Sequence, residues 1–311
     1  MSDDATIAWL LEGDPAIRWQ TLRDLTDAGD DEVAAERARV AREGWGAEVL
    51  ARQLPSGDWG TDGNVDNTWR FDLTTLEILR VLGPDPSDPE VRRRIDLTRE
   101  RVHWPEWFGS PLYFDGEEEA CINGQTLAQG GALGAPSHVL ARRLIGEQLE
   151  DGGWNCDAPQ STRGSFHSTL CVIEGLLAYE QSVGGSPEAA AARERGEQYL
   201  LERSLLRRRS TGELVDERFL HFGWPNRWRY DALRALDHLR AAGHPADPRL
   251  DEALAAVRAR RGADGRWITE TAPLDVPIAL LEAPGAESRM TTLRALRVLR
   301  HFDGDPAAMR E

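Results

Sequence analysis

The stretch Gln148-Leu-Glu-Asp-Gly-Gly-Trp154 has two relatives elsewhere in the chain, and this repeat decides the predicted fold. Gln53-Leu-Pro-Ser-Gly-Asp-Trp59 shares its glutamine, its tryptophan and the glycine two residues before the tryptophan. Arg261-Gly-Ala-Asp-Gly-Arg-Trp267 is a third copy, with arginine in place of glutamine. In each copy the glycine can supply the left-handed conformation that ends a helix. The glutamine amide is expected to bond free carbonyls at a helix end.

Apolar and polar helical stretches alternate around these loops, which predicts helical hairpins. The polar stretches carry charge over much of their surface, as helices of an outer layer do. Runs of alternating β-branched residues are sparse, so strands are not expected. The predicted apolar helices are Pro15–Leu25, Trp69–Leu82, Cys121–Leu133, Phe166–Tyr179, Tyr230–Leu239 and Met290–Leu299, and the polar ones are Glu32–Gln53, Pro89–Val102, Pro187–Arg207 and Pro248–Arg260.

We therefore predict an all-α chain in which residues 1–311 form a single domain. Repeat folds grow beyond the usual size of one core because each unit packs only against its neighbours. The alternation predicts an α/α toroid, or barrel, of about six helical hairpins in two concentric helix layers.

The composition argues against several classes of protein. The formal net charge is −16, from 37 basic and 53 acidic residues, and nucleic-acid binding needs cationic contacts to phosphates. No stretch approaches the roughly 20 apolar residues that span a bilayer, and the first residues show no secretory signal. We expect a cytoplasmic protein with no membrane span and no nucleic-acid partner. The excess of arginine over lysine, with abundant alanine and glycine, is typical of bacterial coding.

Two cysteines and a histidine lie near the predicted starts of neighbouring apolar helices. Cys121 opens one helix, Cys156 follows the second tryptophan loop and His167 lies in the first turn of the next helix. If these helices run parallel, their starts meet at one rim. Two thiolates and an imidazole suit tetrahedral zinc with one open position. Residues 117–119 and Asp157 offer a fourth ligand or outer partners.

Other interpretations of these residues remain open. Cysteine often acts as a small buried hydrophobe, and His167 would then bond backbone at a helix end. A thiol nucleophile, Cys121 or Cys156, with His167 as its base is a second possibility. Cys171 has apolar neighbours, which favours a core position and leaves it as a reserve ligand.

A second group of candidates gathers at other helix starts. Arginines at helix N-termini favour an anionic group such as pyrophosphate or a carboxylate, although Arg–Asp pairs can also simply tie hairpins together. Two tryptophans of the group are candidates for the wall of an apolar pocket. The candidate catalytic residues are Asp66, Tyr230 and Asp231, and the candidate substrate-binding residues are Trp69, Arg70, Asn123, Gln125, Arg227, Trp228 and Arg289.

The tryptophan loops followed by apolar helices resemble the repeats of squalene and oxidosqualene cyclases and of protein prenyltransferase β subunits. Residues 152–156 and 165–176 resemble the prenyltransferase segment in which a Gly-Gly loop leads into Tyr-His-Thr. That resemblance implies a zinc-ligand role for His167, with Cys121 matching the family's cysteine ligand. Cys121-Ile-Asn-Gly124 and residues 227–236 are similar to short bacterial prenyltransferase or squalene-cyclase-like proteins.

The chain departs from these families in its acid motifs. The Asp-x-Asp-Asp of squalene cyclases, the Asp-Cys-Thr-Ala of oxidosqualene cyclases and the aspartate-rich magnesium motif of terpene synthases are absent. We therefore predict a zinc-dependent enzyme that acts on an isoprenoid or other apolar small molecule in the barrel cavity. The alternatives are a metal-independent terpene-cyclase-like enzyme that uses an acid such as Asp66 or Glu118, and a non-catalytic toroid that serves as a binding or scaffold protein.

Overall fold

The computed structural model describes residues 3–61, 63–270 and 281–304, and in these residues it is helical, with four isolated β-bridges and no strand. The predicted all-α class is confirmed. All six predicted apolar helices are present, and we refer to them as the core helices. They are α2 (Pro15–Leu25), α5 (Thr68–Leu82), α7 (Ala120–Leu133), α9 (Phe166–Val183), α11 (Ala232–Ala241) and α13 (Arg289–Asp303).

Seven further α-helices lie before or between the core helices in the described sequence. They are α1 (Asp4–Leu11), α3 (Asp30–Arg37), α4 (Gly44–Leu50), α6 (Pro89–Arg101), α8 (His138–Gly146), α10 (Pro187–Leu201) and α12 (Asp251–Ala259). The short 3-10 helices are η1 (Val65–Asn67), η2 (Glu106–Phe108), η3 (Tyr113–Asp115), η4 (Glu217–Leu220) and η5 (Pro248–Leu250). Among the residues described, no helix is long and apolar enough to cross a membrane.

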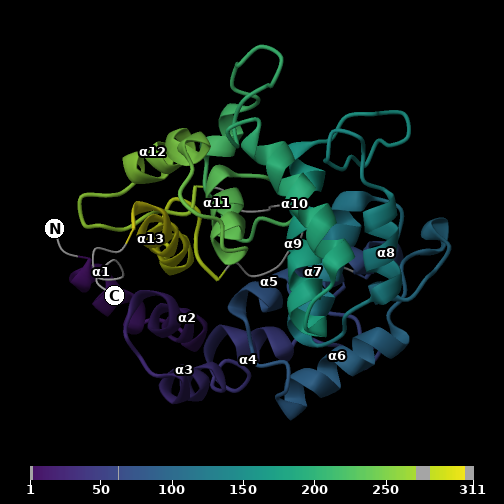
Figure 1. The fold of residues 1–311 in the computed structure, drawn as a ribbon. Helices are drawn as coiled ribbons and strands as arrows, with labels where there is room; N and C mark the ends of the chain where they lie inside the picture. The colour runs from purple at the N-terminus through teal and green to yellow at the C-terminus, as the bar shows by residue number, and fades with distance from the viewer. Residues whose placement is uncertain (1–2, 62, 271–280, 305–311) are drawn as a thin grey trace.

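The core helices contact one another in sequence order (Figure 1). Helix α5 packs against α7, α7 against α9, α11 against α13, and α13 against α2. Helix α9 is joined to α11 by the ion pair of Glu174 with Arg234 at 2.8 Å. Helix α2 is joined to α5 because the Trp19 indole N–H donates to the Leu82 carbonyl at 3.0 Å. The six helices are thus linked from α2 through α13 and back to α2.

Helices α7 and α9 pack backbone to backbone and run in the same direction. A Cβ on Gly124 would lie 2.5 Å from the Cys171 carbonyl, and one on Gly131 would lie 2.6 Å from that of Ala178. Gly124 and Gly131 are seven residues apart in α7, and Cys171 and Ala178 are seven residues apart in α9. Seven residues make about two helical turns, so each pair lies on one face of its helix. The glycines therefore bring the starts of α7 and α9, where Cys121 and His167 lie, to the same end of the molecule.

The tryptophan loops behave as the repeat predicted. Gly57, Gly152 and Gly265 have φ of 106°, 85° and 86°, the left-handed region that favours glycine. The Gln53 amide donates to the carbonyls of Gly57 and Arg94, and the Gln148 amide to those of Gly152 and Ala192. Each glutamine therefore ties its own loop to the polar helix that comes later in the chain, α6 or α10.

The tryptophans of these loops anchor core helices in a common way. The backbone N–H of Trp59 donates to a carboxylate oxygen of Asp72 in α5 at 2.6 Å. The N–H of Trp154 donates to the Thr169 hydroxyl in α9 at 3.0 Å. The third copy repeats this bond, from Trp267 to the Thr292 hydroxyl in α13 at 2.9 Å. All three indoles are buried.

The third loop reaches the first helix of the chain. Arg261, which replaces the glutamine, pairs with Asp3 just before α1. A Cβ on Gly265 would lie 2.7 Å from the Thr6 hydroxyl oxygen in α1. Helix α1 thus contacts the third loop, as α6 and α10 contact the first and second loops. This contact joins the C-terminal part of the fold to the N-terminal part.

Parts of the helix prediction were wrong. Helix Glu32–Gln53 is broken into α3 and α4, because Gly44 takes a left-handed φ of 60° and the Trp45 N–H bonds the Asp14 carboxylate at 2.7 Å. Helices α1 and α8 were not predicted. Helix α11 begins at Ala232 rather than Tyr230, because the Asp231 side chain accepts the Arg234 N–H as an N-cap.

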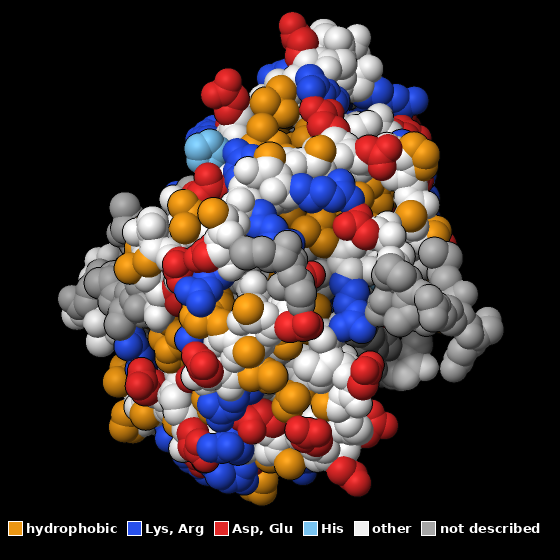
Figure 2. All heavy atoms as spheres, turned by 90° about the vertical axis from the view of Figure 1, so that its left-hand side faces the viewer, with side chains coloured by type: hydrophobic (Ala, Val, Ile, Leu, Met, Phe, Trp, Pro, Cys, Tyr) orange, Lys and Arg blue, Asp and Glu red, His pale blue; other side chains and the backbone are white. Residues whose placement is uncertain are grey.

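The surface carries both positively and negatively charged side chains. Figure 2 shows acidic and arginine side chains interspersed over one face, with hydrophobic side chains scattered among them. Among its described residues, this face therefore has no continuous basic stripe of the kind that tracks a nucleic-acid backbone.

The loop geometry predicts that Gly152→Ala lowers the free energy of unfolding by at least about 1 kcal/mol, the cost of a left-handed non-glycine residue. The new Cβ would also lie 2.7 Å from the Arg195 carbonyl oxygen. Gly146→Ala is the matched control, because this glycine ends α8 and a Cβ added to it would meet no atom within 4 Å. Denaturant unfolding of both variants measures the difference. Equal stability of the two variants would contradict the assigned role of Gly152.

Candidate metal centre and central cavity

Glu119, Cys121 and Cys156 form a cluster of metal-ligand type at the start of α7. One ligand atom from each lies within 4.8 Å of the other two, and within the described parts of the chain this is the one such group of three or more. The Cys121 Sγ lies 3.7 Å from a carboxylate oxygen of Glu119. The backbone N–H of Cys121 donates to the Cys156 Sγ at 3.3 Å. The predicted approach of the two cysteines is therefore present.

The local structure favours a thiolate at Cys156. Its sulfur accepts a hydrogen bond from the backbone N–H of Cys121 in the first turn of α7, where the helix dipole favours negative charge. It also lies 3.2 Å from the Ser168 hydroxyl of α9. The hydrogen bond from the Cys121 thiol is the largest cause that lowers the pKa of Cys156, to about 7. The same bond, with burial, raises the pKa of Cys121 above its usual range.

Glu117 and Asn123 hold the loop that carries Glu119. The Asn123 side-chain carbonyl accepts the Glu117 N–H at 2.7 Å, and its amide donates to the Glu117 carbonyl at 2.9 Å. The buried Glu117 carboxylate in turn accepts the N–H groups of Glu118 and Glu119. Burial raises the pKa of Glu117 to about 7 although these N–H bonds oppose the shift. Asn123, predicted to bind substrate, is instead a positioning residue for the loop.

His167 does not belong to the cluster, which corrects the predicted ligand set. Its Nδ1 accepts the backbone N–H of Tyr230 at 2.9 Å. A neutral imidazole that accepts at Nδ1 carries its proton on Nε2, so neither nitrogen offers a lone pair to a metal. Burial, followed by the charge of Arg234, lowers the pKa of His167 to about 4. The same tautomer argues against His167 as the base of a thiol nucleophile.

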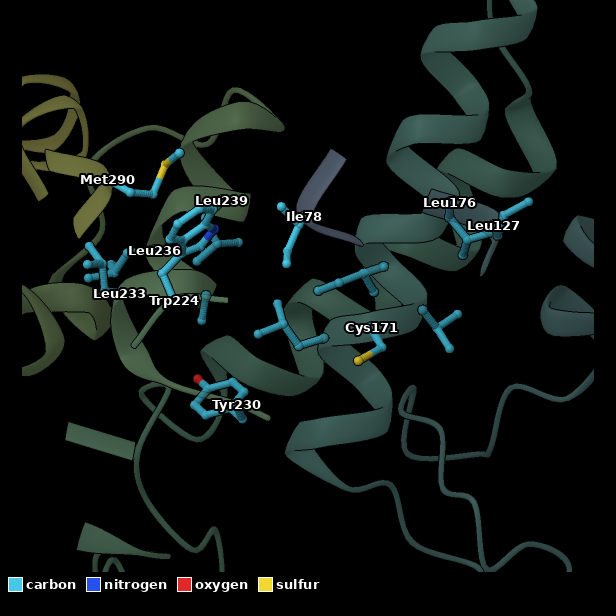
Figure 3. Packing of buried hydrophobic residues seen from close by; sticks show 14 of the residues in the cluster. Ile78, Leu127, Cys171, Leu176, Trp224, Tyr230, Leu233, Leu236, Leu239 and Met290 are labelled. Atoms are coloured by element: carbon cyan, nitrogen blue, oxygen red, sulfur yellow. The ribbon is translucent and has the colours of Figure 1, made fainter. Parts of the chain in front are cut away.

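Cys171 is a core residue, as its apolar neighbours in the sequence favoured. Figure 3 shows its side chain among the buried hydrophobic side chains of the core. Burial raises the pKa of Cys171 to about 12. It is therefore not a ligand of the Glu119/Cys121/Cys156 cluster.

The three predicted catalytic residues lie outside the Glu119/Cys121/Cys156 cluster. The Tyr230 hydroxyl is buried and donates to the Leu205 carbonyl at 2.6 Å. The Asp231 carboxylate caps α11 and also accepts the Asn226 amide. Both residues line a small pocket of about 270 Å³ together with His167 and Trp228. Asp66 lies apart from them, exposed in η1. The structure thus assigns hydrogen-bonding roles within the fold to Tyr230 and Asp231.

The aromatic candidates remain near the starts of core helices. Trp69 packs on Trp104 and Phe108, with ring centroids 5.8 Å and 6.4 Å away. Trp228 lies edge-on to the His167 ring at 5.1 Å and is 38% exposed. Trp228 is therefore available for contact with a ligand, whereas Trp69 is mainly engaged in packing.

The remaining polar candidates are spread over the molecule. The Gln125 amide donates to the Cys121 carbonyl within α7 at 3.0 Å. The Arg289 guanidinium lies over the Trp9 ring at 4.4 Å, so it ties α13 to α1. Arg227 is buried with a positive φ of 51°, and Arg70 is half-buried at the start of α5. The predicted substrate-binding residues therefore do not converge on one pocket.

The structure contains a central cavity of about 560 Å³. The sequence predicted a barrel cavity for an apolar molecule, and it did not predict the charged lining of this cavity. All six core helices contribute to its wall, mostly from their second halves. In α7 the wall residues are Gly131 and Ala132, about 15 Å of helix beyond Cys121 at 1.5 Å per residue. The cavity and the cysteine cluster therefore lie toward opposite ends of the core helices.

The cavity lining is rich in charge rather than apolar. The lining contains seven arginines against three carboxylates, among the described residues. A hydrophobicity pattern read along the sequence hides the arginines, because each helix contributes only one or two of them. The arginines are Arg23, Arg37, Arg80, Arg234, Arg240, Arg294 and Arg297, and the carboxylates are Glu77, Glu174 and Asp237.

The pairing of Glu174 predicts a specific loss of stability in acid. Burial alone would raise the pKa of Glu174, but Arg234 and Arg80 outweigh it and lower the pKa to about 2, from an ordinary value of 4.5. Because the folded pKa is depressed, this contribution is present above about pH 4.5 and is lost as the pH falls toward 2.

Glu174→Gln removes that contribution and leaves Arg234 without its charge partner, at a cost of about 3 kcal/mol near pH 7. The free energy of unfolding, measured against pH for both proteins, should converge as the pH falls below 4.5. Profiles that stay parallel from about pH 7 to about pH 2 would show that Glu174 does not carry this effect.

Comparison of the sequence with protein families and curated proteins gives no match. No protein-family model matches the chain, and no curated protein does. The resemblance to squalene cyclases and prenyltransferase β subunits stays a prediction from the segments 152–156 and 165–176. The function is therefore inferred from the geometry of the cluster and of the cavity.

Proposed function

We propose that the chain is a zinc-dependent enzyme whose metal is held by Glu119, Cys121 and Cys156 at the start of α7. The single observation that carries the proposal is the meeting of two thiols and a carboxylate from segments 35 residues apart. Three protein ligands leave one coordination position for water or substrate, which is typical of catalytic rather than structural zinc.

The donor set fits the size and preference of zinc. Zn–S and Zn–O bonds of about 2.3 Å and about 2.1 Å place a sulfur and an oxygen ligand of a tetrahedron roughly 3.6 Å apart. The 3.7 Å between the Cys121 Sγ and the Glu119 carboxylate oxygen agrees with that spacing. Thiolate and carboxylate oxygen are both common zinc ligands, whereas magnesium and calcium prefer oxygen alone.

Residues around the cluster act by holding the ligands in place. The Ser168 hydroxyl and the Cys121 N–H fix the position of the Cys156 sulfur. The clamp between Glu117 and Asn123 fixes the loop on which Glu119 lies. Such outer partners orient metal ligands and tune their basicity. A bound zinc ion would supply Lewis acidity and activate a water molecule.

The proposed fold is the α/α toroid of about six hairpins in two layers. It is supported by the closed series of contacts from α2 to α13 and by the contact of the third tryptophan loop with α1. The proposed substrate is an apolar small molecule bound at the cluster end of the core helices. Support comes from Trp228, which is 38% exposed and lies beside His167 at the start of α9. The charged lining of the central cavity does not suit an apolar molecule.

The proposal predicts one zinc per chain in protein purified without chelator. Cys121→Ser and Cys156→Ser should lose the metal, and Glu119→Gln should bind it at least about tenfold more weakly. Elemental analysis measures the stoichiometry, and thiolate-to-metal charge-transfer absorption of the cobalt-substituted protein reports the sulfur ligands.

Two matched controls separate this site from the set predicted from sequence. His167→Ala and Cys171→Ser should retain full metal content, because neither side chain belongs to the cluster. Loss of zinc in His167→Ala with retention in Glu119→Gln would overturn the assigned ligands. Metal-free protein that still converts an apolar substrate would favour the metal-independent enzyme. Absence of both metal and turnover would favour a binding or scaffold protein.

A further inference from the structure

The charges around the central cavity fall into two groups that differ in balance. On the α5, α9 and α11 side, Arg80 and Arg234 meet two carboxylates. Glu174 lies 3.4 Å from Arg80 and 2.8 Å from Arg234, and Glu77 lies 2.7 Å from Arg80. Two positive and two negative groups neutralise each other here.

On the α2, α11 and α13 side, arginines outnumber carboxylates. Asp237 lies 3.0 Å from Arg240 and 3.5 Å from Arg294, and it also pairs with Arg297. The other carboxylate, Asp24, lies 2.6 Å from Arg23 and 3.3 Å from Arg297. We refer to Arg23, Arg240, Arg294 and Arg297 as the cavity arginines. Four guanidinium groups therefore pair directly with two carboxylates, and the Asp231 carboxylate acts on Arg294 without a direct ion pair.

Arg37 lies on the same side of the cavity, where the charge of Asp85 partly balances it. Its guanidinium lies 4.8 Å from the centre of the Trp19 ring, and that of Arg23 lies 4.6 Å from it. Arg37 donates to the Gly83 and Pro84 carbonyls at the end of α5. Two like charges thus share one indole at the edge of the cavity.

The Arg294 and Arg297 side chains are only 8% and 11% exposed, whereas that of Arg23 is 44% exposed at the rim of the cavity. Buried charge in excess of its opposite charge costs several kcal/mol, so proteins pair it, neutralise it or use it to bind a ligand. Helix C-termini carry partial negative charge and offset some of the excess, but this effect is confined to the last turn. Arg294 and Arg297 lie in the middle of α13, outside its last turn. The helix ends therefore do not account for the whole excess.

We propose that the central cavity binds a small polyanion, such as a phosphate-bearing or polycarboxylate molecule, between the cavity arginines. The volume of about 560 Å³ suits a metabolite-sized molecule. Planar guanidinium groups bind phosphate and carboxylate oxygens in pairs, which favours them over a neutral ligand. Trp19, Val81 and Leu177 provide the apolar wall for an organic part of the molecule.

This site is independent of the metal centre. The two lie toward opposite ends of the core helices, and none of the cavity arginines belongs to the Glu119/Cys121/Cys156 cluster. Anion binding should therefore be the same in protein with and without zinc. Absence of zinc would therefore not contradict anion binding in the cavity, and absence of anion binding would not contradict the zinc site.

The test is titration calorimetry of the full chain with inorganic pyrophosphate, with citrate and with uncharged glycerol. We expect saturable binding of one anion per chain by pyrophosphate, citrate or both, weakened by added salt, and none by glycerol. Stronger binding of pyrophosphate identifies a phosphate-type ligand, and stronger binding of citrate a polycarboxylate. Absence of saturable binding by either anion would overturn the proposal.

Variants locate the site without breaking the fold. Arg23→Gln combined with Arg240→Gln should weaken anion binding at least about tenfold, while Arg294 and Arg297 still pair with Asp237. Arg93→Gln combined with Arg99→Gln is the matched control, because it removes two charges from exposed positions on α6. Equal loss of affinity in the control and in the cavity variant would show that the anion binds to overall charge and would refute the site.

A second variant has the opposite expected effect. Asp24→Asn releases Arg23 and Arg297 from a competing carboxylate, so anion affinity should rise. A purely structural role for these arginines predicts lower stability of Asp24→Asn with no gain of affinity. Thermal unfolding of the free variants, recorded alongside, shows that each is folded when it is titrated.

Discussion

A hydrogen bond from the backbone N–H of a loop tryptophan to a side-chain oxygen holds three core helices in position. Asp72, Thr169 and Thr292 are the acceptors, each within the first two turns of its helix. The same loops reach sideways through Gln53, Gln148 or Arg261 to another hairpin or to α1. The position of a helix start is thus tied both to its own loop and to the next unit.

The metal centre depends on the second of these anchors. Cys156 follows Trp154 by two residues, and Ser168 precedes Thr169 by one. The bond between Trp154 and Thr169 therefore brings the Cys156 sulfur to the Ser168 hydroxyl. The glycine contacts of α7 with α9 place the first turn of α7 at the same point. Cys121 and Glu119 meet Cys156 as a consequence of packing that serves the fold as a whole.

The sequence was sufficient for the features that repeat. Glycine and tryptophan at fixed spacing predicted the loops, and apolar periodicity predicted six core helices, since both follow from local conformation and burial. His167 was misassigned because the bond between its Nδ1 and the Tyr230 N–H joins residues 63 positions apart. Glu119, considered only as an additional ligand, became part of the cluster once Asn123 and Glu117 fixed its loop. The charged cavity was missed because its arginines come from five separate helices, α2, α3, α5, α11 and α13.

The most direct test of a metal site at the start of α7 is anomalous diffraction at the zinc absorption edge, from crystals of the full chain grown with zinc. We expect one strong peak within bonding distance of the Cys121 and Cys156 sulfurs and a Glu119 oxygen. A peak at His167, or no peak between the two sulfurs at full zinc saturation, would contradict the proposed centre.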